Sequence, residues 1–447
     1  MKARNLLTGL IFLGLVLGVL IGHFVLYDAS AIGTDAYTDS IQGWRNAGEL
    51  VFIRPLQMMI IPLVFTSVLT GIMSIGDPKK LGILGGATVI FYVTTMILAV
   101  VVGVAMAATL QPGSNLPSEV IQEGLAAGQT KVAEIGAVER ASEGIGAAWL
   151  NILYQMVPNN FLSAAVEVQA LSVITGTILL GIGIVVVGDK KTKPFKDAIE
   201  GLHEVLMTIV QWIIWLMPLG VMFLVAWAVA AIGLGTLFQS LGKYVIIVLV
   251  GLLIHMTISL PAVLAIVGKL NPYKFMWSMR AALMTAFGTS SSMATLPVTI
   301  ETCHEAGCSK RATGLVLPLG ATVNMDGTAL YQGVTVIFFF QAFGYDLGFA
   351  QYLAIVMTAT LAAIGTAAVP GASFITMIII IGAVNTTMAG TSGFDPVPAA
   401  AIGLILPVDR ILDMCRTTVN VWGDSVGARA ISRLAPDEEE EREAAFA

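Results

Sequence analysis

The sequence is poor in charge. Asp, Glu, Lys and Arg make up 12% of the 447 residues, against about 25% in typical soluble domains. Hydrophobic residues make up 56%, and apolar runs of bilayer-crossing length, roughly 20 residues, recur along the chain. A transmembrane β-barrel would instead show weak alternating segments of about 10 residues. The composition therefore excludes an ordinary soluble domain and predicts an all-α polytopic membrane protein.

Cysteine and histidine are also scarce. The three cysteines, Cys303, Cys308 and Cys415, are irregularly spaced, so they predict neither a disulfide framework nor a zinc site. The histidines are scattered without metal-ligand spacing. Because the sequence contains no placed nucleophile–base pair or metal cluster, we do not expect an enzyme or an organic cofactor.

The positions of Lys and Arg orient the apolar segments, because cytoplasmic loops are enriched in these residues. With the N-terminus in the cytoplasm, the basic loops at 188–196, 268–274 and 309–311 are cytoplasmic, and the polar insertion at 112–148 is external. Segment 273–303 must then enter and leave on one side. Its polar centre, "GTSSSMATLP", predicts a re-entrant helical hairpin, since non-helical backbone at membrane depth needs cover from protein or contact with water.

A second hairpin is predicted at 349–384, which starts and ends outside. The stretch "IGTAAVPGAS" at 364–373 interrupts it, and Gly365, Pro370 and Gly371 suit a mobile lid. An ordinary transmembrane kink is the alternative. Two hairpins of opposite orientation, each followed by an interrupted or charged span, form an inverted repeat, which is typical of secondary transporters.

One mostly apolar segment, 405–431, carries a stripe of polar residues along one helical face. A charge at mid-membrane costs on the order of 2.5–3.5 kcal/mol on insertion scales. The stripe therefore needs a substrate, ions or its own members as partners, and an ion-pair ladder from Asp413 to Arg416 is the alternative. Arg410 lies off the stripe, where we expect only local pairing. The stripe consists of Asp409, Asp413, Arg416, Asn420 and Asp424.

Two further stretches carry ligand chemistry. In "LGATVNMDGTALYQ", Asp326 lies in an apolar span with Asn, Gly and Thr, whose hard oxygens suit alkali cations; a flexible kink is the alternative. In "SSSMATLP", hydroxyl and backbone N–H groups at a hairpin tip suit an anionic carboxylate. A serine nucleophile would need a base, and His304 lies about three turns away.

Four motifs in order closely resemble those of the dicarboxylate/amino acid:cation symporters. They are "SSSMATLPVT", "NMDGTALYQ", "IGTAAVPGA" and "LDMCRTTVNVWGD". That family includes prokaryotic aspartate and glutamate transporters and the mammalian excitatory amino acid transporters, and the resemblance covers nearly the whole chain. It implies eight transmembrane helices plus two re-entrant helical hairpins with inverted repeats, assembled as a homotrimer of elevator-type transporters.

The resemblance also implies a division of the chain, with both termini cytoplasmic and the protein in the cytoplasmic (inner) membrane. A scaffold forms the trimer, and a transport domain moves against it. The parts are 1–78 (scaffold helices 1 and 2), 79–111 (transport-domain helix 3), 112–148 (extracellular loop), 149–235 (scaffold helices 4 and 5), 236–432 (transport domain with helices 6 to 8 and both hairpins) and 433–447 (acidic cytoplasmic tail).

For the substrate, the resemblance makes Arg416 the clamp for a side-chain carboxylate, a role that suits a bidentate guanidinium. Asp413 takes the ammonium group, and Asp409 is placed to orient Arg416. Ser290 and Met293 depart from prokaryotic relatives, which have Arg and Ser there. The other implied substrate residues are Ser291, Ser292, Met325, Thr328, Val369, Gly371, Ala372, Thr417 and Asn420.

For sodium, the resemblance implies three sites. Met96 replaces a hydroxyl ligand that some relatives have beside Thr95, which puts the third site and the stoichiometry in doubt. The first site comprises Gly320, Asn324, Asn420 and Asp424; the second Thr322, Ala363, Ile364 and Thr366; the third Tyr92, Thr95, Asn324 and Asp326.

The sequence thus predicts a sodium-driven symporter for aspartate or glutamate in the lipid bilayer, with no nucleic-acid partner. A C4-dicarboxylate symporter is the alternative, although a dicarboxylate has no ammonium to neutralise Asp413. Proton coupling is a further alternative. A channel is disfavoured because two lids around one site suit alternating access.

Overall fold

The computed structural model describes residues 2–28, 31, 34–75, 78–114, 116–134, 156–167, 169–232, 241–364, 373–389 and 392–436. Every regular element among these residues is a helix, which confirms the all-α prediction for this part of the chain. The first elements are α1 (Lys2–Ile21), η1 (Gly22–Leu26), α2 (Asp35–Gly48), η2 (Glu49–Ile53), α3 (Arg54–Ile75), α4 (Pro78–Leu110), α5 (Ser118–Glu134), α7 (Phe161–Val166), α8 (Ala170–Val187), α9 (Asp189–Ile214) and α10 (Met217–Ile232). The later elements are α12 (Gly242–Ile254), η3 (His255–Ser259), α13 (Leu260–Val263), η4 (Leu264–Gly268), α14 (Pro272–Ser278), α15 (Arg280–Thr289), α16 (Ser292–Glu305), α17 (Lys310–Val323), α18 (Asp326–Ala342), α19 (Phe349–Ile364), α20 (Ser373–Met388), η5 (Ala399–Ile405) and α21 (Leu406–Ile431).

Several helices have membrane dimensions. By length and composition, four helical runs in the described part of the chain can cross a bilayer. Helices α9 and α10 qualify together but bend by 55° at their break, and α8, α19 and α20 contain shorter apolar stretches. The four runs are Gly9–Leu26, Ala36–Met73, Gly82–Leu110 and Gly242–Gly268.

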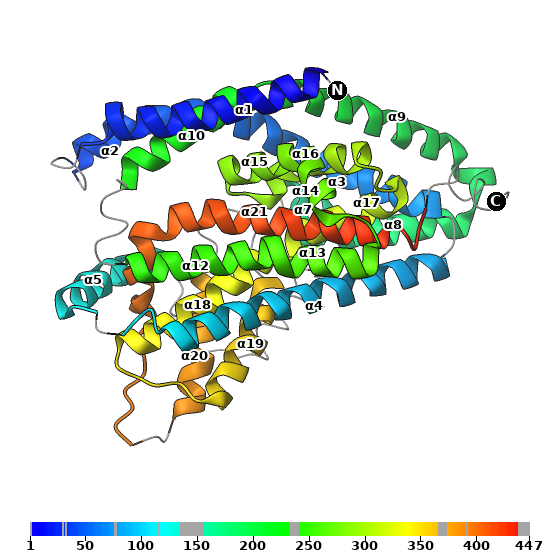
Figure 1. Cartoon of the computed structure of the whole chain (residues 1–447). Helices are drawn as coiled ribbons and strands as arrows, with labels where there is room; N and C mark the ends of the chain where they lie inside the picture. Colours follow the sequence, from blue (N-terminus) through cyan, green and yellow to red (C-terminus); the bar gives the residue numbers. More distant parts are fainter. Residues whose placement is uncertain are drawn as a thin grey trace.

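Helices α1, α2 and α10 form a layer along one side of the molecule (Figure 1). Helix α1 packs closely along α10 because glycines face it at every fourth position. A Cβ atom on Gly14, Gly18 or Gly22 would collide with a backbone carbonyl oxygen of α10. Small residues at this spacing allow membrane helices to approach each other closely.

Helix α18 lies at the centre of the core. Its residues from Asp326 to Phe340 are buried, and its three consecutive phenylalanines are completely enclosed. A helix that is buried all round has no wet face. Its polar residues, including Thr328 and Gln332, therefore need partners inside the protein.

The predicted breaks appear between helices in the C-terminal half. Helix α15 ends at Ser290, whose φ of +51° is left-handed, and Ser291 caps α16. Non-helical Asn324 and Met325 separate α17 from α18. Helices α19 and α20 pack against each other, and the predicted tip at 365–372 lies outside the described residues.

The polar insertion at 112–148 contains a helix that we did not predict. Helix α5 packs on η5 through glycines, and a Cβ atom on Gly124 or Gly128 would collide with η5. The segment is rich in Ala, Glu and Gln, which favour helix. Its mixed polarity concealed the apolar period that would have indicated a packed helix.

Candidate functional site

The stripe of α21 is buried, and its outer part forms an ion-pair cluster. Asp409, Asp413 and Arg416 expose 6%, 4% and 2% of their surfaces. The Arg416 Nε donates to Asp413 Oδ1 at 2.9 Å, and its Nη1 donates to Asp409 Oδ1 at 3.2 Å. Thr417 Oγ1 donates to the same Asp413 oxygen at 3.4 Å. Two carboxyl groups thus hold one guanidinium.

Tyr331 on α18 completes this cluster. Its hydroxyl donates to Asp409 Oδ1 at 2.8 Å, and the Arg416 Cζ lies 4.5 Å from the centre of its ring. The ring therefore offers Arg416 a cation–π contact. We did not predict Tyr331 as a site residue from the sequence, although it lies within the motif "NMDGTALYQ". The signal was a phenol on an otherwise apolar buried helix, where a hydroxyl needs a partner.

The tip between α15 and α16 is a second polar element. Ser291 Oγ accepts from the backbone N–H of Ala294 at 3.1 Å and so caps α16. The Ser291 N–H donates to Thr289 Oγ1 at 3.2 Å. Ser290 Oγ is buried and has no hydrogen-bond partner among the described residues. The tip therefore places hydroxyl groups at a helix N-terminus, where an anionic group is stabilised.

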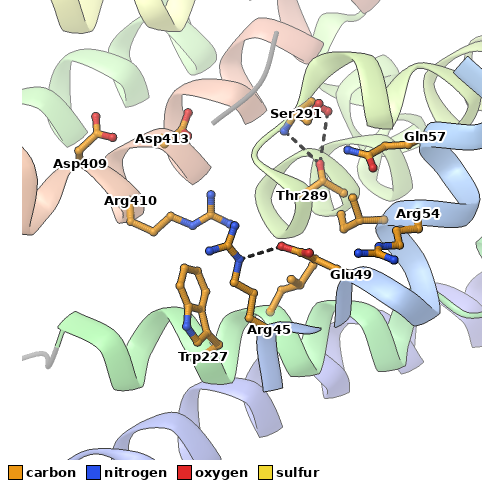
Figure 2. A pocket seen from close by; sticks show the side chains of 12 residues that line it. Arg45, Glu49, Arg54, Gln57, Trp227, Thr289, Ser291, Asp409, Arg410 and Asp413 are labelled. Carbon is orange, nitrogen blue, oxygen red and sulfur yellow. Dashed lines mark hydrogen bonds and ion pairs between the residues drawn. The ribbon is translucent and has the colours of Figure 1, made fainter. Parts of the chain in front are cut away.

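A cavity of about 510 Å³ joins the tip to α21. Ser291, Asp409 and Asp413 all line it, as Figure 2 shows. Asp413 Oδ2 is buried without a hydrogen-bond partner in the described part of the chain. The structure therefore brings predicted substrate residues from two elements to one cavity, beside an acceptor that can take another hydrogen bond.

Asn420 ties the α17–α18 break to α21. Its Oδ1 accepts from the N–H groups of Gly327 and Thr328 at 2.7 and 3.3 Å. Its Nδ2 lies 3.2 Å from Thr328 Oγ1 and 3.3 Å from the Met325 sulfur. A Cβ atom on Gly327 would collide with the backbone oxygen of Arg416. The predicted residues Met325, Thr328 and Asn420 therefore lie together.

The inner part of the stripe has a different chemistry. Asp424 Oδ1 accepts from Asn324 Nδ2 at 3.0 Å, and Thr95 Oγ1 lies 3.4 Å from Asn324 Oδ1. A Cβ atom on Gly320 would lie 2.6 Å from Asp424 Oδ1, so the Gly320 backbone passes directly beside this carboxylate. Asp424, Asn324 and Thr95 contribute a carboxylate, an amide oxygen and a hydroxyl oxygen, a set that suits a hard monovalent cation.

Asp326 is the most deeply buried carboxylate of this region. Both of its oxygens lack hydrogen-bond partners among the described residues. His255 Nε2 approaches Asp326 Oδ2 at 3.4 Å, and both side chains have zero exposure. The sequence analysis set His255 aside because it matched no metal spacing, and its contact with Asp326 comes only from the fold.

Of the other predicted sodium ligands, Tyr92 borders the same place, because a Cβ atom on Gly320 would collide with its hydroxyl oxygen. Tyr92 donates its hydroxyl to the Val316 backbone oxygen at 2.8 Å. Thr322 Oγ1 donates to the Leu319 backbone oxygen at 2.9 Å. Helix α19, which carries Ala363 and Ile364, touches α17. The remaining predicted residues, Thr366, Val369, Gly371 and Ala372, lie outside the described part of the chain.

These observations define a class of protein: an all-helical membrane transporter with a buried, charged site among apolar helices. The chain belongs to the Sodium:dicarboxylate symporter family, whose sequence profile matches residues 7–434. It is therefore a sodium-coupled, multi-pass membrane symporter of amino acids or dicarboxylates, and not an enzyme.

Individual relatives differ in what their names say they carry. The chain is 34% identical to excitatory amino acid transporter 1 of Ambystoma tigrinum, covering 88% of this chain and 77% of the relative. It is equally, 34%, identical to the human neutral amino acid transporter B(0), covering 95% and 79%. Identity to the proton/sodium-glutamate symport protein of Bacillus subtilis (strain 168) is 32%, covering 95% and 91%.

Proposed function

We propose that the chain takes up acidic amino acids, L-aspartate or L-glutamate, together with sodium. The observation that carries this proposal is Arg416, held in a buried cluster by Asp409, Asp413 and Tyr331 at the edge of a cavity. A substrate carboxylate would take over the guanidinium in bidentate fashion. The substrate ammonium would bind the released Asp413, so the exchange conserves the number of charge pairs.

The same cluster separates the acidic substrate from its alternatives. A neutral amino acid supplies no second carboxylate for Arg416. Its binding would therefore not offset the loss of the ion pairs from Arg416 to Asp409 and Asp413. A C4-dicarboxylate supplies two carboxylates but no cation for Asp413, whose Oδ2 has no partner among the described residues. An acidic amino acid satisfies both groups, which supports it over a dicarboxylate.

Sodium is the proposed coupling ion because Asp424 has only neutral hydrogen-bond partners in the described part of the chain. A buried carboxylate without a cation is costly, and a bound cation would remove that cost. Asn420 and Asp424 lie on the substrate helix, so ion and substrate would order the same residues. One observation favours the proton-coupled alternative: the buried contact between His255 and Asp326 offers a place for a proton.

The proposed architecture is an elevator transporter with eight transmembrane helices and two re-entrant hairpins. The packed pairs α15–α16 and α19–α20 support the hairpins. The cavity has α2, α3 and α10 on one side and α15 and α21 on the other. This separation supports a scaffold (1–78, 149–235) and a transport domain (79–111, 236–432). We further propose that the scaffold forms a homotrimer and that both termini are cytoplasmic.

Uptake into proteoliposomes tests the function. We expect accumulation of radiolabelled aspartate or glutamate under an inward sodium gradient, with little uptake of succinate or serine. Potassium or choline in place of sodium, at equal osmolarity, provides the control. Preferred uptake of serine or succinate would reject the acidic substrate, and full uptake driven by a proton gradient alone would reject sodium coupling.

A further inference from the structure

The cavity of about 510 Å³ extends beyond the predicted substrate residues. Its other wall comes from α2, η2, α3 and α10 and carries Arg45, Glu49, Arg54 and Trp227. Figure 2 shows this wall facing Asp409 and Arg410 across the cavity. By the topology proposed above, the cavity opens on the outer side of the Arg416 cluster. None of the residues proposed for substrate or sodium lies on this second wall.

Arg410 is the unexplained charge of α21. Its Cζ lies 5.5 Å from the centre of the Trp227 indole, and the Cζ of Arg45 lies 5.0 Å from the same centre. Figure 2 shows both guanidinium groups reaching this indole from different elements. The local ion pair expected for Arg410 is not present in the described part of the chain, and its Nε is buried without a hydrogen-bond partner.

Each acidic side chain of the cavity is paired with an arginine other than Arg410, although Asp413 Oδ2 is left without a partner among the described residues. Glu49 Oε1 accepts from Arg45 Nε at 2.7 Å, while Asp409 and Asp413 hold Arg416. Arg410 therefore has no carboxylate partner within ion-pair distance among the described residues, and it shares one indole with a second cation. Like charges at one ring repel unless an anion lies between them. An incoming carboxylate would relieve this repulsion and satisfy the Arg410 Nε.

The backbone of this wall contains one of the four π-helical turns in the described part of the chain. Glu49 begins the π-helical turn η2, which links α2 to α3. Such turns are rare and are frequent at functional sites, because the extra residue redirects the side chains around it. Here the turn holds Glu49 against Arg45 and keeps that guanidinium at the Trp227 ring.

We propose that Arg410 and Arg45, supported by Trp227, form an outer docking subsite for the carboxylate of an incoming acidic amino acid. This inference rests on the acidic substrate proposed above. Arg416 follows Arg410 by six residues on the same helix, a rise of about 9 Å. The ligand binds first at Arg410, with its ammonium group free to approach Asp413 Oδ2, and then passes inward to Arg416. The subsite raises the local concentration of acidic ligand at the clamp.

Stopped-flow binding of L-aspartate in sodium, with full-length protein in nanodiscs of zwitterionic lipid, tests the subsite. We expect Arg410→Gln to lower the association rate constant at least tenfold and to flatten its dependence on ionic strength. Arg410→Lys keeps the charge and should restore most of the rate. Arg433→Gln is the matched control, because it removes one exposed cation from just beyond the far end of the same helix. It should leave the rate unchanged.

A second measurement separates this subsite from the main site. In Arg416→Ala, L-aspartate at millimolar concentration should still change the fluorescence of Trp227, seen as the difference from the same protein carrying Trp227→Phe. Adding Arg410→Gln should abolish that change. If the Arg416→Ala protein shows no Trp227 response, or if Arg410→Gln binds aspartate at the wild-type rate, the subsite does not exist.

Two outcomes identify other causes. A Trp227 response that disappears in nanodiscs containing anionic lipid would show that a lipid phosphate occupies the cavity, which would overturn the proposal. If the wild-type protein binds serine more tightly than aspartate, the proposed function is rejected. The subsite is rejected by a different result, namely that aspartate does not change the Trp227 fluorescence of Arg416→Ala.

Discussion

Helix α21 carries two polar regions that satisfy their charges in opposite ways. Around Arg416, two carboxylates, a guanidinium and a phenol pair with one another. Around Asp424, the carboxylate accepts a hydrogen bond from the Asn324 amide and has no fixed cation within ion-pair distance among the described residues. The first region can bind a ligand only by exchanging partners, whereas the second gains from any cation of suitable size. This difference suggests how one helix selects a zwitterionic acid and a metal ion at separate places.

The largest effect is expected where the exchange takes place. Arg416→Ala should reduce aspartate affinity on the order of 10²–10³-fold, because the side-chain carboxylate of the ligand loses the guanidinium proposed to hold it and enters a site that keeps Asp409 and Asp413. Equilibrium binding in saturating sodium measures the change. The control is Arg433→Ala, at an exposed arginine of the same chain region, which should bind like the wild type. Near-normal aspartate affinity in Arg416→Ala would show that Arg416 does not bind the substrate carboxylate.

The second-largest effect is expected from removing the Asp424 carboxylate. Asp424→Asn should raise the sodium concentration for half-maximal binding about 10- to 100-fold, since a charge-assisted interaction is worth roughly 1.5–3 kcal/mol. Asp413→Asn is the matched variant. It should weaken aspartate binding and leave the binding of sodium to the free protein nearly unchanged. Equal effects of the two variants on sodium would mean that the two regions are not distinct.

A backbone variant probes the same region without changing a charge. In Gly320→Ala the new Cβ would collide with the Tyr92 hydroxyl and lie 2.6 Å from Asp424 Oδ1, so both of these predicted sodium ligands must shift. We expect sodium affinity to fall about tenfold, in line with the 1–3 kcal/mol cost of overpacking. Gly86→Ala is the control, because a Cβ there meets nothing within 4 Å. Sodium titration of both variants measures the effect. Identical sodium-binding curves for the two variants would show that the cation does not bind beside Gly320.

The smallest effect concerns the residue that supports the clamp. Tyr331→Phe removes the hydroxyl that donates to Asp409 and keeps the ring against Arg416. Aspartate affinity should change by about 3- to 10-fold, the net worth of one typical hydrogen bond of roughly 0.5–1.5 kcal/mol, because the hydroxyl supports the clamp and does not itself bind the ligand. Sodium affinity should stay the same. Tyr345→Phe, whose hydroxyl donates to the distant Asp395 backbone oxygen, provides the comparison. A shift in sodium affinity alone would contradict the assignment of Tyr331 to the outer region.

Much of this comparison was visible in the sequence, because a helical stripe is a local pattern. The period of 3.6 residues placed Asp413, Arg416 and Asp424 on one face without knowledge of the fold. The motifs around Ser291 and Asn324 marked the helix breaks for the same reason: polar and non-helical residues interrupt an apolar run.

Contacts between distant segments were not accessible in this way. His255 reaches Asp326 across 71 positions of sequence, and no local spacing predicts their meeting. Arg410 faces Trp227 on α10 only because α10 and α21 border the same cavity. Helix α5 was hidden because two of the residues that pack on η5 are Gly124 and Gly128, which carry no hydrophobic signal, and the rest of the segment is of mixed polarity.

The central claim is that acid and sodium bind to one stripe and stabilise each other. Calorimetric titration of L-aspartate into the purified protein at several sodium concentrations tests it most directly. Reciprocal linkage requires that each ligand tighten the other by the same factor. We predict that aspartate affinity rises at least tenfold for each tenfold increase in sodium below saturation, with choline keeping the ionic strength constant. An affinity that does not change with sodium would contradict the account.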